Sequence, residues 1–145
     1  MPSWVTSGYH EYAKRMPNNC QLILHEVPSQ FRGKNPDIPR LLRDEGQKML
    51  KLVPKGAEVV ALDPQGKGMS TESLARDLEV WMSGGRDIAL LVGGPEGLSP
   101  DCLKLARRKW SLSKLTFPHP LVRVIVAESL YRAWSVMTNH PYHRA

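Results

Sequence analysis

Residues 91–100, with the sequence LVGGPEGLSP, have the composition of a ligand-binding loop. The loop follows the apolar run Ile88–Val92, which predicts a buried parallel strand, and it ends at Ser99 and Pro100, which predict a capped helix start. Three glycines between a strand and a helix let backbone amides and carbonyls approach a flat ligand. The spacing matches neither G-x-x-x-x-G-K-[ST] nor G-x-G-x-x-G. The loop therefore indicates either a nucleotide-like ligand not held through a triphosphate, or a plain turn.

The C-terminal tail concentrates groups that bind RNA. His140, Tyr142, His143 and Arg144 follow one another closely at the end of the chain. Aromatic, imidazole and guanidinium groups stack on unpaired bases and contact phosphates. Two histidines without a neighbouring Cys, Asp or Glu make a poor zinc set, so we expect no metal.

Two further candidates lie before the tail, and each also has a structural interpretation. His119 is flanked by prolines that fix the backbone, so it is either a substrate contact or a packed histidine. Glu128 and Arg132 are four residues apart, so they share a helix face and can pair.

Polar and basic residues in the loops also have both a functional and a structural interpretation. Asp63 either accepts a hydrogen bond from a ribose or amine, or forms a turn before Pro64. Glu96 either orients a ligand amine or favours the following helix N-terminus. The basic runs Arg32-Gly33-Lys34 and Arg107-Arg108-Lys109 either contact phosphates or are solvated surface.

Helices and strands alternate along the chain, which predicts an α/β fold with a mostly parallel sheet. The predicted helices are Pro2–Arg15, Asp37–Val53, Ser70–Met82, Pro100–Lys109 and Leu121–Met137, and the predicted strands are Gln21–Val27, Ala57–Leu62, Asp87–Val92 and Ser111–Leu115. In such sheets ligands bind beyond the carboxyl ends of the strands. Three loops meet this condition, namely 62–66, 93–97 and 113–120.

Composition and charge narrow the class of protein. The 145 residues are 41% hydrophobic and 23% charged, which suits one globular domain. The net charge of +6 favours a polyanionic partner such as nucleic acid. The longest apolar region, 121–137, is interrupted by Arg123, Glu128 and Arg132 and cannot span a membrane. Two distant cysteines and no signal peptide indicate reduced thiols in the cytoplasm.

Taken together, several stretches resemble the RlmH family, small SPOUT-class methyltransferases that modify N3 of a pseudouridine in bacterial large-subunit (23S) ribosomal RNA. The resemblance covers essentially the whole chain. The matching stretches are Arg32–Asn35, Leu91–Pro100, Trp110–Ser113, Pro118–Arg123, Ala127–Trp134 and Asn139–Arg144.

The resemblance implies a fold and a cofactor. It implies a C-terminal deep trefoil knot, which is an exception to the rule that chains do not thread loops. It also implies a homodimer, and a tail that closes over the cofactor of the neighbouring protomer. S-adenosylmethionine would contact Leu62, Gly93, Leu112, Ser113, Lys114, Leu115, Thr116 and Phe117, largely through backbone atoms.

Methylation at N3 of a pseudouridine would require specific roles of the catalytic candidates. Neutral pseudouridine is a poor nucleophile at N3, so a base or a polarising cation must assist. His119, Tyr142 and His143 are the candidates for taking the proton, and Arg132 and Arg144 for holding a phosphate or a ring carbonyl. The base must also be unstacked from its RNA loop, and we expect assembled ribosomes to be the substrate.

One departure from the family concerns the start of the chain. Relatives begin with a short apolar strand before the Met-Pro-x-Trp of the first helix, whereas this sequence opens at Met1-Pro2-Ser3-Trp4. We therefore expect 1–145 to lack one strand of the natural protein. Alternatives from other classes are a SPOUT enzyme acting on another RNA, a non-catalytic ribosome-binding factor, and a nucleotide-dependent enzyme, for which no phosphate-binding residues are found.

Overall fold

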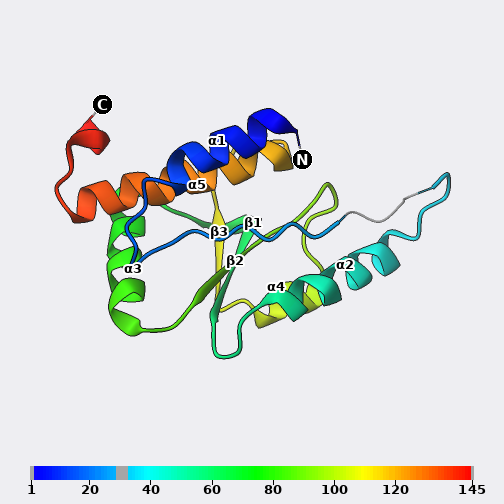
Figure 1. Ribbon diagram of the computed structural model, residues 1–145. Coiled ribbons are helices and arrows are strands. Elements are labelled where there is room, and N and C mark those ends of the chain that lie inside the picture. The colour runs from blue at the N-terminus through cyan, green and yellow to red at the C-terminus, as the bar shows by residue number, and fades with distance from the viewer. Residues whose placement is uncertain (1, 29–32, 145) are drawn as a thin grey trace. The chain divides into compact units, whose positions relative to one another are not determined.

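The computed structural model describes residues 2–28 and 33–144, which form two compact units (Figure 1). The helical unit is drawn from Met1–Ile23, Met69–Gly85 and Phe117–Ala145, and the sheet unit from Leu24–Gly68 and Arg86–Thr116. The basic residue Arg32, a candidate phosphate contact, lies outside the described residues.

The sheet unit is a parallel sheet of three strands with two helices. Strands β1 (Glu58–Gly68), β2 (Ile88–Val92) and β3 (Arg108–Ser111) lie in the order β2-β1-β3, and both pairings are parallel. The predicted parallel sheet is therefore confirmed. The core of this unit is Val59, Leu91 and Cys102, packed against apolar side chains of α2 (Ile38–Leu52) and the loops around α4 (Pro100–Leu105).

Helix ends in the sheet unit follow the capping residues of the sequence. The Asp37 carboxylate accepts a hydrogen bond from the Arg40 amide at 3.2 Å, and the Ser99 hydroxyl accepts one from the Cys102 amide at 3.2 Å. Both satisfy amides that the first helical turn leaves unpaired. Gly46 on α2 allows a close approach of α4, because a Cβ there would overlap the Ser99 side chain.

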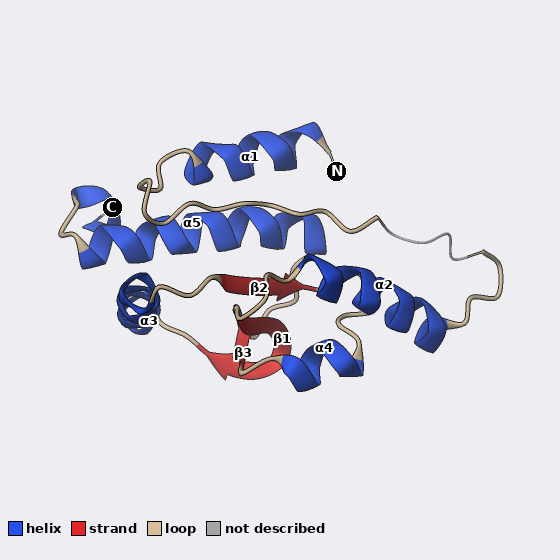
Figure 2. Cartoon of the chain, turned by 60° about the horizontal axis from the view of Figure 1, so that its bottom comes forward, coloured by secondary structure: helices blue, strands red, loops and turns tan. Residues whose placement is uncertain are grey.

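The helical unit packs three helices and a C-terminal turn. Helices α1 (Ser3–Ala13) and α3 (Thr71–Gly84) both pack on α5 (His119–Met137), and the 3-10 turn η1 (Pro141–Arg144) packs on the same helix. Figure 2 shows α1 running alongside α5. Ser70 and Ser73 form a reciprocal capping box at the start of α3, and Gly85 ends this helix in the left-handed conformation at φ 71°.

Two predicted strands are wrong. In the structure, Gln21–Val27 pairs with no strand of the described residues. A segment with a strand-like pattern becomes a strand only where a neighbouring strand can share its backbone hydrogen bonds. The strand predicted at Ser111–Leu115 lies earlier, at Arg108–Ser111, and the helix before it ends at Leu105 rather than Lys109. Arg108 and Lys109 lie on an edge strand, where charged residues are common.

The first strand of the sheet also continues beyond its predicted end. Ala57–Leu62 was expected to stop at the Asp63–Gly66 turn, but β1 resumes the ladder at Lys67 and ends at Gly68. Leu62 and Lys67 both pair with Trp110, so residues 63–66 form a bulge. Pro64 lacks an amide proton and cannot take part in the ladder, which explains the interruption.

Candidate functional site

Three segments meet at the carboxyl edge of the sheet. Leu62 on β1 pairs with Val92 on one side and with Trp110 on the other. Gly93 comes directly after Val92, and Leu112 comes two residues after Trp110. Both therefore lie near Leu62, at the end of the sheet. The structure thus brings together Leu62, Gly93 and the segment that starts at Leu112, which are the expected cofactor contacts of the sheet unit.

The glycine loop closes on itself. A Cβ on Gly93 would lie 2.6 Å from the carbonyl oxygen of Gly97, and Gly97 has φ 82°. The Gly97 amide donates to the Gly94 carbonyl at 3.0 Å. Two of the three glycines are therefore required by the loop backbone itself. A Cβ on Gly94, in contrast, would meet nothing within 4 Å, so this position faces open space.

The segment after β3 is held by serine hydroxyls. Ser111 donates to the Ser113 carbonyl at 3.0 Å, and the Ser113 hydroxyl accepts from the Leu115 amide at 3.0 Å. Lys114, Leu115 and Thr116 are exposed, and the apolar Leu115 side chain is 73% exposed. An ordered turn that presents an apolar side chain outward suits contact with a ligand. Phe117, the last expected cofactor contact, belongs to the helical unit.

Asp63 has the structural role that the sequence allowed. Its carboxylate accepts a hydrogen bond from the Gln65 amide at 3.1 Å, which is the geometry of an Asx turn. The turn lies within the β1 bulge, where Gly66 packs directly on the next strand. A Cβ on Gly66 would lie 2.6 Å from the Lys109 carbonyl carbon and 2.8 Å from the Trp110 nitrogen.

The close packing of Gly66 on the next strand leads to a testable prediction about the stability of the protein. Gly66→Ala should destabilise the protein by about 1–3 kcal/mol, because the new methyl group must displace backbone rather than a flexible side chain. Gly68→Ala is the matched control, since a Cβ there meets nothing within 4 Å and both glycines lie on the same strand. Urea unfolding of both variants measures the difference, and equal stabilities would contradict the close approach.

Two of the catalytic candidates, Arg132 and Tyr142, contact one carboxylate on α5, that of Glu128. The guanidinium of Arg132 donates to Oε1 of Glu128 through Nη2 at 2.7 Å and Nε at 2.8 Å. The Tyr142 hydroxyl donates to the same oxygen at 3.1 Å, and the Arg132 guanidinium lies 5.1 Å from the centroid of the Tyr142 ring. The expected Glu128–Arg132 pair is confirmed. Its second partner, Tyr142, was missed because it comes from a different element.

The protonation of this cluster follows from its contacts. The hydrogen bond to Glu128 raises the pKa of Arg132, which stays a cation. Burial, and then the neighbouring Tyr12 hydroxyl and the Glu128 carboxylate, raise the pKa of Tyr142 above its ordinary value. Tyr142 is therefore held as a neutral hydrogen-bond donor. Its ring also meets the Tyr131 ring edge-on, with 4.7 Å between the ring centroids.

The remaining tail residues pack back on the end of α5. Asn139, at φ 57°, turns the chain after the helix, and the His140 amide donates to the Ser135 carbonyl at 2.7 Å. His143 Nδ1 lies 3.3 Å from the hydroxyl of Ser135. Chain ends are usually poorly ordered, but residues 141–144 form the turn η1. The Arg144 side chain lies outside the description.

His119 lies at the start of α5, where Pro118 precedes the helix and Pro120 occupies its first turn. The side chain is half-buried. Five catalytic candidates, His119, Arg132, Tyr142, His143 and Arg144, thus all belong to the helical unit, and four of them lie on its C-terminal helix end and tail.

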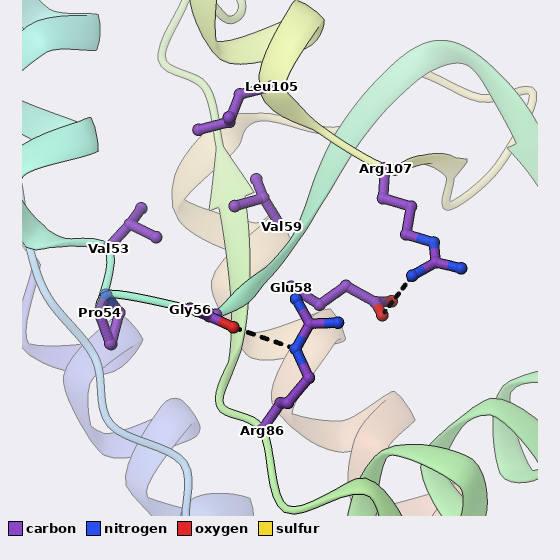
Figure 3. A pocket seen from close by; sticks show the side chains of 9 residues that line it. Val53, Pro54, Gly56, Glu58, Val59, Arg86, Leu105 and Arg107 are labelled. Carbon is purple, nitrogen blue, oxygen red and sulfur yellow. Dashed lines mark hydrogen bonds and ion pairs between the residues drawn. The ribbon is translucent and has the colours of Figure 1, made fainter.

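A pocket of about 330 Å³ opens at the other edge of the sheet, where β1 and β2 begin (Figure 3). Arg86 donates through Nε to the Gly56 carbonyl at 3.0 Å, and Arg107 lies 3.8 Å from the Glu58 carboxylate. The basic residue Arg107 therefore pairs within the protein. Because the pocket lies at the amino ends of parallel strands, it is separate from the three loops described above.

The described residues form neither a metal site nor a membrane-spanning helix. Within residues 2–28 and 33–144, no three His, Cys, Asp or Glu side chains come together as a metal site. Among the same described residues, no helix has the length and apolarity needed to cross a bilayer.

Comparison with known proteins assigns the family. The family model described as "Predicted SPOUT methyltransferase" matches residues 1–143. This family carries out S-adenosylmethionine-dependent methylation of RNA. The carboxyl edge fits this cofactor, because it presents the exposed apolar side chain of Leu115, backbone turns ordered by serine hydroxyls and open space at Gly94. The match and this geometry agree, and the chain belongs to the SPOUT methyltransferase family.

Proposed function

We propose that this protein methylates N3 of a pseudouridine in bacterial large-subunit ribosomal RNA, acting on assembled ribosomes in the cytoplasm. The observation that carries the proposal is the ordered tail, in which Tyr142 packs beside Arg132 and His143 beside Ser135, all on α5. Aromatic, imidazole and guanidinium groups in one place are suited to an unstacked base and its phosphate. The resemblance of the same residues to the RlmH family supports this substrate.

The chemistry divides between the cofactor and the protein. S-adenosylmethionine, when bound, would supply an electrophilic methyl group, because its sulfonium sulfur can keep the electron pair of the S–CH₃ bond. Leu62, Gly93 and residues 112–117 would hold it. The chain's remaining task is to align N3 and remove its proton. His119 and His143 are the candidates for accepting that proton, because Tyr142 is held as a neutral donor to Glu128. Arg132 and Arg144 would hold a phosphate or a ring carbonyl.

We include the homodimer and the trefoil knot in this proposal. In a symmetric dimer, the tail of one protomer can act at the cofactor loops of its partner, which would make the active site composite. The net charge of +6 supports binding of the RNA backbone, whose phosphates favour cationic surfaces.

The proposed substrate is tested by transfer of labelled methyl from S-adenosylmethionine. Assembled ribosomes, naked ribosomal RNA and transfer RNA are compared at one salt concentration, because binding to phosphates depends on salt. We expect label in the large-subunit RNA of assembled ribosomes. Label in transfer RNA alone would favour a SPOUT enzyme of other specificity, and binding to ribosomes without cofactor binding would favour a non-catalytic factor.

Glu128 gives a specific prediction for this reaction. Glu128→Ala should lower kcat about tenfold to a hundredfold, because hydrogen bonds to a charged group each contribute about 1.5–3 kcal/mol. Both Arg132 and Tyr142 lose their shared acceptor in this variant. The control is Glu79→Ala on α3, which also removes a helix carboxylate from the helical unit. Unchanged kcat in Glu128→Ala would contradict the role of the cluster.

A further inference from the structure

The buried hydroxyl of Ser135 lies between a carbonyl oxygen, which can only accept a hydrogen bond, and a histidine nitrogen, which can donate or accept one. Its side chain is fully buried, with 0% of its surface exposed. Oγ lies 2.6 Å from the backbone carbonyl oxygen of Arg132 and 3.3 Å from Nδ1 of His143. These two contacts link α5 to the C-terminal turn η1.

Counting protons determines the direction of both hydrogen bonds. A carbonyl oxygen has no proton, so at 2.6 Å the Ser135 hydroxyl must donate to it, as helical serines commonly do. A hydroxyl has only one proton. At His143 the Ser135 oxygen can therefore only accept, and Nδ1 must carry the donated hydrogen.

The tautomer of His143 follows. In a neutral imidazole one nitrogen carries the proton and the other carries a lone pair. With the proton on Nδ1, the lone pair lies on Nε2, the nitrogen turned away from Ser135. His143 is half-buried, so part of the residue is open to solvent.

The other groups of the cluster do not offer a lone pair of this kind. The Tyr142 hydroxyl donates its proton to Glu128, and the Arg132 guanidinium is a cation paired with the same carboxylate. Among the tail residues whose side chains are described, His143 is thus the group whose orientation makes it an acceptor for a substrate proton.

We propose that Nε2 of His143 accepts the N3 proton of the substrate base, and that Ser135 is a positioning residue that fixes the required tautomer. This inference rests on the proposed function and names the proton acceptor for it. The N3–H bond breaks and its proton goes to Nε2. The electron pair left on N3 forms the bond to the methyl carbon, while the pair of the old S–CH₃ bond stays on sulfur. The imidazolium then returns its proton to water.

The tautomer can be measured directly on the full chain without RNA. Long-range ¹H–¹⁵N correlation spectra of ¹⁵N-histidine-labelled protein distinguish a protonated ring nitrogen from one with a lone pair, and His143→Gln identifies the His143 signals. At about pH 8, where imidazoles are mostly neutral, we expect Nδ1 to be protonated and Nε2 to carry the lone pair. The opposite assignment would overturn the inference.

Turnover tests the functional consequence. Ser135→Ala should lower kcat roughly threefold to tenfold, the size of one net hydrogen bond, with the KM for S-adenosylmethionine unchanged. Ser83→Ala is the matched control, because the Ser83 hydroxyl also donates to a helix carbonyl, that of Glu79 at 2.9 Å, on α3. Adding Ser135→Ala to His143→Gln should cause no further loss, whereas a purely structural serine would give additive losses.

The two proposals fail in distinguishable ways. An Nδ1 lone pair overturns the role of Ser135 and His143 even if ribosomes are methylated. Absence of ribosomal methylation overturns the proposed function, while the spectra of the RNA-free protein still report the tautomer.

Discussion

Removal of Tyr142–Ala145 is expected to abolish turnover while sparing cofactor binding. The deletion takes away the Tyr142 hydroxyl bonded to Glu128 and the His143 ring beside Ser135. All three cofactor segments of the sheet unit remain. We expect kcat to fall at least about a hundredfold, the usual contribution of positioned acid–base groups. The Kd for S-adenosylmethionine should change far less, because the deletion leaves the expected cofactor segments in place.

Calorimetric titration of cofactor and single-turnover methyl transfer measure the two effects separately. A chain that lacks only Ala145 is the control, because it retains the whole of η1. Equal losses of affinity and turnover would show that the tail holds the cofactor, and would contradict a separate catalytic role.

Gly93→Ala should have the complementary effect, a loss of cofactor affinity. The added methyl group would lie 2.6 Å from the Gly97 carbonyl oxygen, so the loop must open to accommodate it. Overpacking of this kind costs about 1–3 kcal/mol, and because the closed loop is the conformation expected to bind the cofactor, this corresponds to about fivefold to 150-fold in affinity.

Gly94→Ala separates this clash from the general effect of replacing a loop glycine. A Cβ on Gly94 meets nothing within 4 Å, so the melting temperature of the cofactor-free protein should remain that of the wild type. Gly93→Ala should lower the melting temperature and weaken S-adenosylmethionine binding together. A Gly93→Ala protein that binds the cofactor normally would contradict a role for the closed loop.

Local sequence signals predicted the helices and the edge of the sheet that carries the loops. Asp37, Ser70 and Ser99 each cap the helix that they were expected to start, because capping depends only on residues within one turn. The order of strands and loops also placed Leu62 and Gly93 at one edge, since this follows from parallel pairing. Leu112 was expected there only from the family resemblance, because the strand before it was predicted too late in the chain.

Signals that depend on distant partners were less informative. Trp110 forms part of β3 because β1 lies beside it, and nothing in the local pattern of Arg108 and Lys109 predicts this pairing. Likewise, Tyr142 reaches Glu128 because Asn139 turns the chain back on α5. Ser135 was not predicted as a site residue, because a serine within a helix can position His143 only once the tail has folded against that helix.

The most direct test of the account is the identity of the methylated nucleoside. Ribosomes lacking the modification are incubated with the protein and S-adenosylmethionine, and the large-subunit RNA is digested to nucleosides and analysed by mass spectrometry. We expect a pseudouridine carrying one added methyl group at N3, formed by the wild-type chain and not by the chain without Tyr142–Ala145. Methylation of a different nucleoside, or of none despite cofactor binding, would contradict it.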